Sequence, residues 1–137
     1  MIDRWVWIVI MTVNNNKRIL LVDDEPDITF SFGIGLEDNG FKVDTFNNPL
    51  EAISNFKSDF YDLVVLDIKM PEMNGINLCK EIRKIDSEIK VCFLTAFDSR
   101  YGEFKQCSEC FIRKPITIDG LVEKVKSFSM NARPHTY

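Results

Sequence analysis

Short apolar runs alternate with longer segments of helical period from Lys17 onward, and this alternation constrains the fold more than any other feature of the chain. Three of the runs are almost continuously apolar, as strands covered on both faces are. The run at residues 42–46 alternates between polar and apolar side chains instead, which predicts an edge strand. The five predicted strands are residues 19–23, 42–46, 63–67, 91–95 and 110–113. The pattern predicts an α/β fold, a doubly wound parallel sheet in three layers.

The predicted helices rest on apolar side chains that recur three or four residues apart. In the first of them Ile28, Phe32 and Leu36 have this spacing, and Gly40 follows its end. The helices are expected at residues 27–39, from Asn48-Pro49 onward, at 76–84, more weakly at 100–107, and at 118–128. The order is therefore five βα units. We expect one domain at residues 17–128, an N-terminal extension at 1–16 and a polar tail at 129–137.

Composition narrows the classes of function. The chain has 137 residues with 45% hydrophobic side chains, a formal net charge of -4 and a pI near 5.0. Such a chain lacks the basic excess that drives binding to a phosphate backbone, so we expect no direct contact with nucleic acid.

The cysteines carry no regular framework spacing, which favours a reducing compartment and a cytoplasmic protein. They are Cys79, Cys92, Cys107 and Cys110. Cys107 and Cys110 have the spacing of a redox or zinc half-site, but zinc needs four ligands and no second pair lies nearby. We expect Cys107 and Cys110 to be buried or loop cysteines without disulfide or metal chemistry.

The N-terminal extension contains a short apolar run, residues 5–13, preceded by Arg4. One alternative is the core of a signal peptide, which we disfavour because no small-residue cleavage site follows the run. The run is also too short to span a bilayer, which takes about 20 apolar residues. Met11 allows the alternative that residues 1–10 are a mis-assigned start. A third alternative is that Trp5, Trp7 and Ile10 cover an apolar surface or mediate self-association. The sequence does not choose among these.

Polar side chains stand at the carboxyl ends of four predicted strands, where ligands bind in an open parallel sheet. Clustered carboxylates repel one another, and their hard oxygen atoms suit Mg²⁺. One carboxylate can then act as a nucleophile toward phosphorus, while an ammonium and a hydroxyl hydrogen-bond the phosphoryl oxygens. The residues are Asp23 and Asp24 as metal ligands, with Glu25 beside them, Asp67 as nucleophile, Thr95 as hydroxyl donor and Lys114 as ammonium donor.

These residues, in this order, resemble the receiver domain of two-component response regulators from about Lys17 to Phe128. The motifs are Leu21-Val22-Asp23-Asp24-Glu25, Leu66-Asp67-Ile68-Lys69-Met70-Pro71 with Asn74-Gly75, Thr95-Ala96, and Lys114-Pro115. The resemblance implies a flavodoxin-like sheet of order 2-1-3-4-5 and a cis Lys114-Pro115 peptide. It also implies a phosphoryl group received from a histidine kinase or a phosphotransfer protein.

The resemblance further implies a ligand set and a switch. Mg²⁺ (or Mn²⁺) would be bound directly by Asp24, Asp67 and the Lys69 carbonyl, and mostly through water by Asp23. The switch would couple the Thr95 hydroxyl to rotation of Phe111. Because Phe lacks a hydroxyl, any preference of that ring for an inward position must come from burial.

Two departures from the family pattern affect the predicted fourth helix and the predicted lifetime of the phosphorylated state. The stretch from Thr95 to Lys114 is a few residues short, so we expect a short or irregular fourth helix. Lys69 and Phe97 stand where the family tunes hydrolysis of phosphoaspartate, and neither aligns an attacking water. We therefore predict slow autodephosphorylation.

Other interpretations account for each residue singly. Asp23, Asp24 and Glu25 could charge a helix N-terminus, Asp67 could be a solvated strand end and Lys114 a surface loop residue. Their coincidence at four strand ends favours a site.

Two functional alternatives remain. One is a constitutive interaction module that is never phosphorylated. A phosphatase is disfavoured, because Lys69 occupies the place of its second Asp. We expect a protein that catalyses only its own phosphorylation and dephosphorylation, is no enzyme otherwise, and signals through a downstream protein partner.

Overall fold

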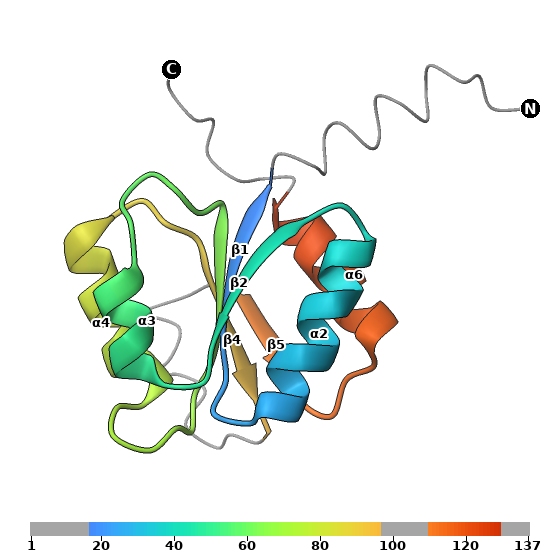
Figure 1. The fold of residues 1–137 in the computed structure, drawn as a ribbon, viewed down its shortest axis with the longest axis horizontal. Helices are drawn as coiled ribbons and strands as arrows, with labels where there is room; N and C mark the ends of the chain where they lie inside the picture. Colours follow the sequence, from blue (N-terminus) through green and yellow to red (C-terminus); the bar gives the residue numbers. More distant parts are fainter. Residues whose placement is uncertain (1–16, 97–109, 130–137) are drawn as a thin grey trace, which may run out of the picture.

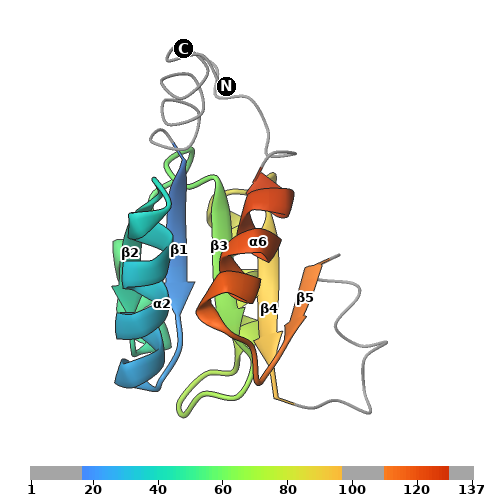
Figure 2. The same ribbon diagram turned by 90° about the vertical axis from the view of Figure 1, so that its right-hand side faces the viewer.

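The computed structural model describes residues 17–96 and 110–129, which form a parallel sheet covered by helices on both faces (Figure 1). In chain order the elements are β1 (Arg18–Val22), α2 (Pro26–Asp38), β2 (Lys42–Phe46), α3 (Pro49–Asn55), β3 (Leu63–Asp67), α4 (Gly75–Ile85), β4 (Val91–Thr95), β5 (Cys110–Arg113) and α6 (Ile118–Ser129). The five strands lie in the order β2-β1-β3-β4-β5, and Figure 2 shows this order with α2 and α6 in front of the sheet. The predicted fold class and sheet order are confirmed.

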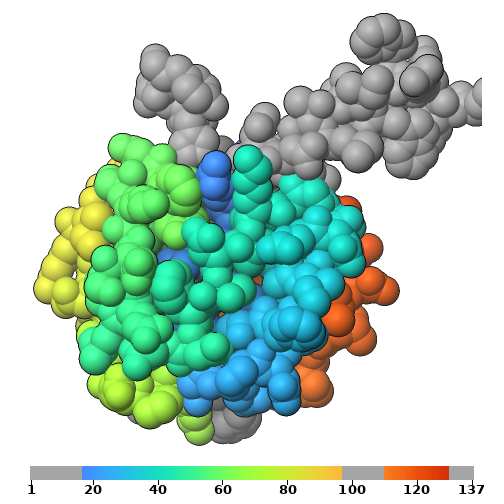
Figure 3. Space-filling model, viewed as in Figure 1, coloured from blue at the N-terminus to red at the C-terminus, as the bar shows by residue number. Residues whose placement is uncertain are grey.

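The predicted strands agree closely with the observed ones. Four have the predicted bounds, and β1 begins and ends one residue earlier. β2 is an edge strand, as its alternating pattern predicted, and Figure 3 shows it in turquoise on one face between α3 and α2. The described helices differ from the prediction by at most one residue at each end for which a bound was predicted. The predicted helix at 100–107, the N-terminal extension and residues 130–137 lie outside the described residues.

The buried strands β1, β3 and β4 divide their side chains between two cores, because successive residues of a strand point to opposite faces. Leu20 and Leu66 belong to the core under α3 and α4, whereas Leu21 and Leu94 belong to the core under α2 and α6. Burial of each such side chain contributes about 1.5–3 kcal/mol to stability. This two-sided burial fixes the register of the sheet and with it the position of every strand end.

Polar caps determine where two helices begin. The side chain of Asn48 accepts hydrogen bonds from the amides of Leu50 and Glu51 at the start of α3. The side chain of Asn74 accepts one from the amide of Asn77 at the start of α4. Each cap satisfies amides that have no partner within the helix and contributes about 1 kcal/mol. The N-terminus of α4 lies beside the end of β3, where the Gly75 amide donates to the backbone oxygen of Ile68.

The expectation that Cys110 takes no part in a disulfide was wrong. Cys92 on β4 and Cys110 on β5 form a disulfide, with 4.5 Å between their Cα atoms. They are partners in the parallel register of the two strands, which a sequence spacing of 18 residues does not reveal. Cys79, a buried residue of α4, belongs to the core on the opposite face of the sheet. Cys107, the other half of the predicted Cys-x-x-Cys motif, lies outside the described residues.

None of the helices in the described ranges is long and apolar enough to cross a membrane.

Candidate functional site

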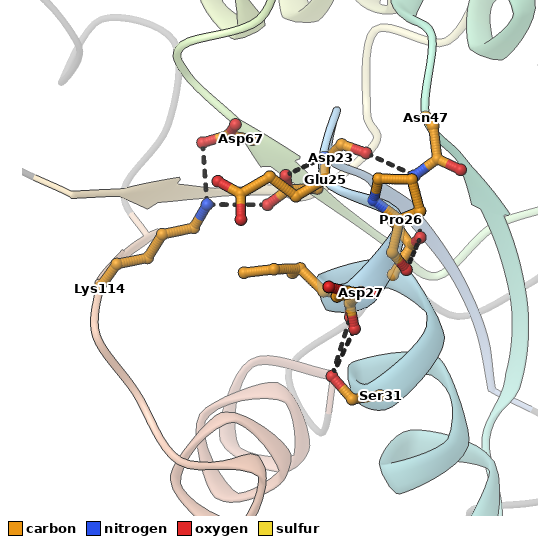
Figure 4. A network of polar contacts seen from close by, with 10 residues as sticks. Asp23, Glu25, Pro26, Asp27, Ser31, Asn47, Asp67 and Lys114 are labelled. Atoms are coloured by element: carbon orange, nitrogen blue, oxygen red, sulfur yellow. Dashed lines mark hydrogen bonds and ion pairs between the residues drawn. The ribbon is translucent and has the colours of Figure 1, made fainter.

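The carboxyl ends of β1, β3, β4 and β5 place the predicted site residues along one edge of the sheet. Asp23 follows β1 directly, Asp67 is the last residue of β3, Thr95 is the last of β4, and Lys114 follows β5. Because neighbouring parallel strands end at the same edge, residues up to 91 positions apart in the sequence come into contact. Figure 4 shows Lys114 extended toward Asp23 and Asp67.

The ammonium of Lys114 bridges two carboxylates. Its Nζ atom lies 2.8 Å from Oδ2 of Asp23 and 3.3 Å from Oδ1 of Asp67. The Asp23 side chain is fully buried and that of Asp67 is 8% exposed, so neither charge is well solvated. A buried carboxylate needs such a partner, because loss of its hydration is costly. The structure thus brings together three residues that the sequence predicted as nucleophile, ammonium donor and metal ligand.

The pKa values in this cluster are shifted. Burial, repulsion by Asp23 and a hydrogen bond with Asp24 raise the pKa of Asp67 from 3.8 to about 7, although Lys114 opposes the shift. Burial by itself lowers the pKa of Lys114, but its hydrogen bonds and ion pairs with Asp23 and Asp67 more than offset this, so the pKa rises above its ordinary value. Lys114 is therefore a cation at neutral pH. Asp67 needs further positive charge to become fully ionised.

A cation fits this excess of negative charge. Asp23, Asp24 and Glu25 place carboxylate oxygens within 4.8 Å of one another, and Asp24 lies close enough to Asp67 to favour its protonated form. Hard oxygen donors in this number suit Mg²⁺ or Mn²⁺. Of the ligands predicted from the sequence, Asp23 and Asp24 belong to this group, and Asp67 is joined to Asp23 through Lys114. The full predicted set of Asp23, Asp24, Asp67 and Lys69 stays a prediction. Glu25 is exposed at the rim of the cluster.

Asn47 holds the acidic loop, and sequence reasoning missed it. Its side-chain amide donates to the backbone oxygen of Asp23 at 2.8 Å and to the Thr29 hydroxyl at 2.9 Å. The amide of Asp23 in turn donates to the backbone oxygen of Phe46. Asn47 therefore ties the loop after β1 to the end of β2. An asparagine between a strand and a helix is such a common turn residue that its type carries no functional signal.

The comparisons with known proteins agree with this geometry. The sequence profile of the response regulator receiver domain family matches residues 19–126. The chain belongs to this family.

Relatives of this receiver domain include transcriptional regulators. It is 39% identical over 115 residues to the transcriptional regulatory protein CpxR homolog of Haemophilus influenzae, a match that covers 81% of the chain and 49% of the relative. It is 33% identical over 116 residues to the transcriptional regulatory protein PrrA of Mycobacterium leprae, covering 82% of the chain and 50% of the relative. The chain spans about half the length of these curated relatives.

Solved structures match the receiver fold over nearly their whole length. The non-phosphorylated HemR receiver domain of Leptospira biflexa has a TM-score of 0.78 at 29% identity, covering 88% of this chain and 99% of its own. Response regulator TrrA of Thermotoga maritima, in complex with Mg²⁺-BeF, has a TM-score of 0.71 at 39% identity, covering 82% and 98%. A further matched structure holds histidine kinase ThkA in complex with TrrA, with a TM-score of 0.72 at 39% identity and coverage of 82% and 97%.

The structure describes all but one of the other residues that the sequence singled out for the site and the switch. Thr95 is buried at the end of β4, and its backbone oxygen accepts a hydrogen bond of 2.7 Å from the Lys114 amide. Phe111 is half-buried on β5, with its ring centroid 5.9 Å from that of Phe93 on β4. Lys69 is exposed two residues beyond Asp67. The predicted cis peptide between Lys114 and Pro115 is present. Phe97, the other predicted tuning position, lies outside the described residues.

Close packing holds Asp67 against α4. A Cβ atom on Gly75, the first residue of α4, would contact the backbone oxygen of Asp67 and lie 3.0 Å from the Ile68 Cα atom. The Gly75 amide donates to the backbone oxygen of Ile68 at 2.8 Å. Only glycine allows this approach, so the end of β3 is fixed by the backbone as well as by its side-chain contacts.

Proposed function

We propose that the chain is a phosphorylation-dependent signalling switch that accepts a phosphoryl group on Asp67. The observation that carries the proposal is the Lys114 ammonium, which lies within hydrogen-bonding distance of both Asp67 and Asp23 at the ends of three strands. A positive group at this place stabilises the carboxylate before the reaction and the negative charge on the phosphoryl oxygens as the new bond forms.

The transfer that we propose uses a phosphohistidine as donor. An Asp67 carboxylate oxygen attacks phosphorus, an O–P bond forms, and the P–N bond breaks with its electron pair going to the imidazole. Lys114 donates to one phosphoryl oxygen and the Thr95 hydroxyl to another. The residues that would hold Mg²⁺ or Mn²⁺ are Asp23, Asp24, Asp67 and the Lys69 carbonyl. A bound divalent cation would supply neutralisation of the carboxylates and of the incoming phosphoryl oxygens.

The donor that we infer is a histidine kinase or a phosphotransfer protein, in the cytoplasm. The kinase complex of the TrrA relative supports this type of donor. The chain catalyses only its own phosphorylation and dephosphorylation, and it loses the phosphoryl group slowly because Lys69, exposed beside the site, does not align water. The signal passes from Thr95 to Phe111 and changes the affinity for a downstream protein. The curated names of two relatives support transcription regulation as the pathway.

The test uses the phosphoryl mimic beryllium fluoride with Mg²⁺ and follows backbone amides by NMR. We expect shifts around Asp67, Thr95 and Phe111, and none in the Asp67→Asn variant. A small phosphodonor such as acetyl phosphate should give a covalent adduct on Asp67 in mass spectrometry. An unchanged spectrum and no adduct would sink the proposal and leave the constitutive interaction module.

A further inference from the structure

A disulfide joins the two strands that carry the proposed switch. Cys92 and Cys110 face each other in the register of β4 and β5, and both belong to the core under α2 and α6. Their Cα atoms are 4.5 Å apart, within the range that a disulfide spans without movement of the backbone. Any thiols at these positions would therefore be held side by side by the sheet itself.

The positions of the two cysteines differ in access. Cys92 is fully buried on the inner strand β4, whereas Cys110 is the first residue of the edge strand β5 and is 4% exposed. Strand ends at an edge open locally at a lower cost than the interior of a sheet. A reagent from solution can thus reach Cys110 first.

We propose that Cys92 and Cys110 form a reversible redox site that is oxidised by low-molecular-weight disulfides, and that its oxidised state weakens the response of the switch to a phosphoryl group. The second part of this inference rests on the proposed function. Permanent disulfides belong to oxidising compartments, whereas those formed in reducing ones are in most cases transient and redox-sensing.

The reaction is a pair of thiol–disulfide exchanges. The Cys110 thiolate attacks one sulfur of oxidised glutathione, which breaks the glutathione S–S bond and releases one glutathione thiolate. The Cys92 thiolate then attacks the Cys110 sulfur and releases the second. The two cysteine protons end on the two glutathione molecules, so two protein thiols are oxidised and one glutathione disulfide is reduced. Excess reduced glutathione drives the same steps backward.

The link is placed where it can act on the switch. The next register pair along β4 and β5 is Phe93 with Phe111, whose rings are in contact on the opposite face of the sheet. Two residues further on, Thr95 is the register partner of Arg113, and its backbone oxygen accepts from the Lys114 amide. A covalent tie one residue before Phe111 limits how far β5 can shift against β4. Any active state that needs such a shift becomes less accessible.

Peptide mapping of the full chain tests the redox site. The protein is equilibrated with excess oxidised or excess reduced glutathione, alkylated, and cut with trypsin and a Glu-specific protease. Glu109 separates Cys107 from Cys110, so the expected product joins residues 91–100 to 110–113. We expect this product in oxidised glutathione and its loss in reduced glutathione, for the wild type and for the Cys107→Ser control. A link from Cys107 instead, no link, or a link that persists in reduced glutathione would overturn the proposal.

Beryllium fluoride titrations with Mg²⁺, followed by NMR, test the coupling. Oxidation should weaken apparent affinity by about fivefold in the wild type and leave the Cys110→Ala variant unchanged. Because Cys92 is fully buried, Cys92→Ala serves only as a second variant. Equal affinities of the oxidised and reduced wild type would overturn the coupling, whereas failure of the reduced wild type to respond would overturn the proposed function. The peptide map decides the redox site in either case.

Discussion

The ammonium of Lys114 lies 2.8 Å from the fully buried carboxylate of Asp23. Among the ion pairs of the described residues, this is the one that Asp23 makes. The pair joins the segment after β1 to the segment after β5, across the intervening strands β3 and β4. Lys114 therefore contributes both to the stability of the fold and to the proposed phosphorylation site.

Replacement of Lys114 by Ala should destabilise the fold. It leaves the Asp23 carboxylate buried without this partner and increases its repulsion with Asp67, a change that costs about 3–5 kcal/mol for a buried pair. The free energy of unfolding from urea titration at pH 8, without divalent cation, measures this loss. Mg²⁺ should restore part of it, because it offsets the same charges.

Lys84 provides the control for that measurement. Its ion pair with Glu81 has a similar length of 2.8 Å, but its side chain is 70% exposed. Lys84→Ala should change the unfolding free energy by no more than about 0.5 kcal/mol. Equal losses in the two variants would contradict the role assigned to burial.

The raised pKa of Asp67 predicts a pH dependence of stability. Its pKa rises from 3.8 to about 7 on folding, chiefly by burial, so ionisation opposes the fold. The protonated carboxyl of Asp67 adds to the free energy of unfolding. This contribution is fully present below about pH 4 and is lost as the pH rises through about 7. Asp67→Asn removes this loss, so it should stabilise the chain by about 2 kcal/mol at pH 8 and by less at pH 5. Urea unfolding in EDTA at both pH values measures the difference.

Asp27→Asn is the matched control, because Asp27 is an exposed carboxylate near the same acidic loop. Its stability should follow the wild-type pH profile. Added Mg²⁺ at pH 8 should reduce the advantage of Asp67→Asn, since the cation favours the ionised form of Asp67. Parallel pH profiles of the wild type and Asp67→Asn would show that the carboxylate is not destabilised in the fold.

The sequence predicted the strand ends because their signals are local. A buried parallel strand is an apolar run that stops at its first polar residue, and Asp67 and Thr95 mark two such stops. Which carboxylate holds Lys114 most closely is not local, because it depends on the lateral order of strands and on the rotamers of three side chains. The Cys92–Cys110 pair and the contact of Asn47 with Asp23 were missed for the same reason. Both depend on the register of neighbouring strands, β4 with β5 and β1 with β2, which the residue pattern of a single strand does not reveal.

Loss of the Asn47 amide should loosen the acidic loop. Asn47→Ala removes hydrogen bonds to the Asp23 backbone oxygen and the Thr29 hydroxyl, at a cost of about 1–2 kcal/mol. Because the loop carries Asp23 and Asp24, affinity for Mg²⁺ should fall severalfold, as measured by calorimetry. Asn55→Ala removes a hydrogen bond of 2.8 Å from an exposed amide to the Glu51 backbone oxygen and should leave Mg²⁺ affinity unchanged. Unaltered Mg²⁺ affinity in Asn47→Ala would refute the positioning role.

Two glycine-to-alanine changes should differ in their effect on stability, because only Gly75 has backbone atoms against the position of an added Cβ. At Gly75 an added Cβ contacts the Asp67 backbone oxygen, so α4 must move away from the end of β3, and we expect a loss of about 2–3 kcal/mol. At Gly33, inside α2, the added Cβ meets only the Thr45 side chain at 3.4 Å. Alanine is favoured over glycine in a helix interior by about 1 kcal/mol, so Gly33→Ala should be neutral or stabilising.

Thermal unfolding compares the stability of the two variants. Affinity for beryllium fluoride should fall only in Gly75→Ala, since only that change displaces Asp67. If Gly75→Ala keeps both stability and affinity, the contact between α4 and β3 does not position the nucleophile.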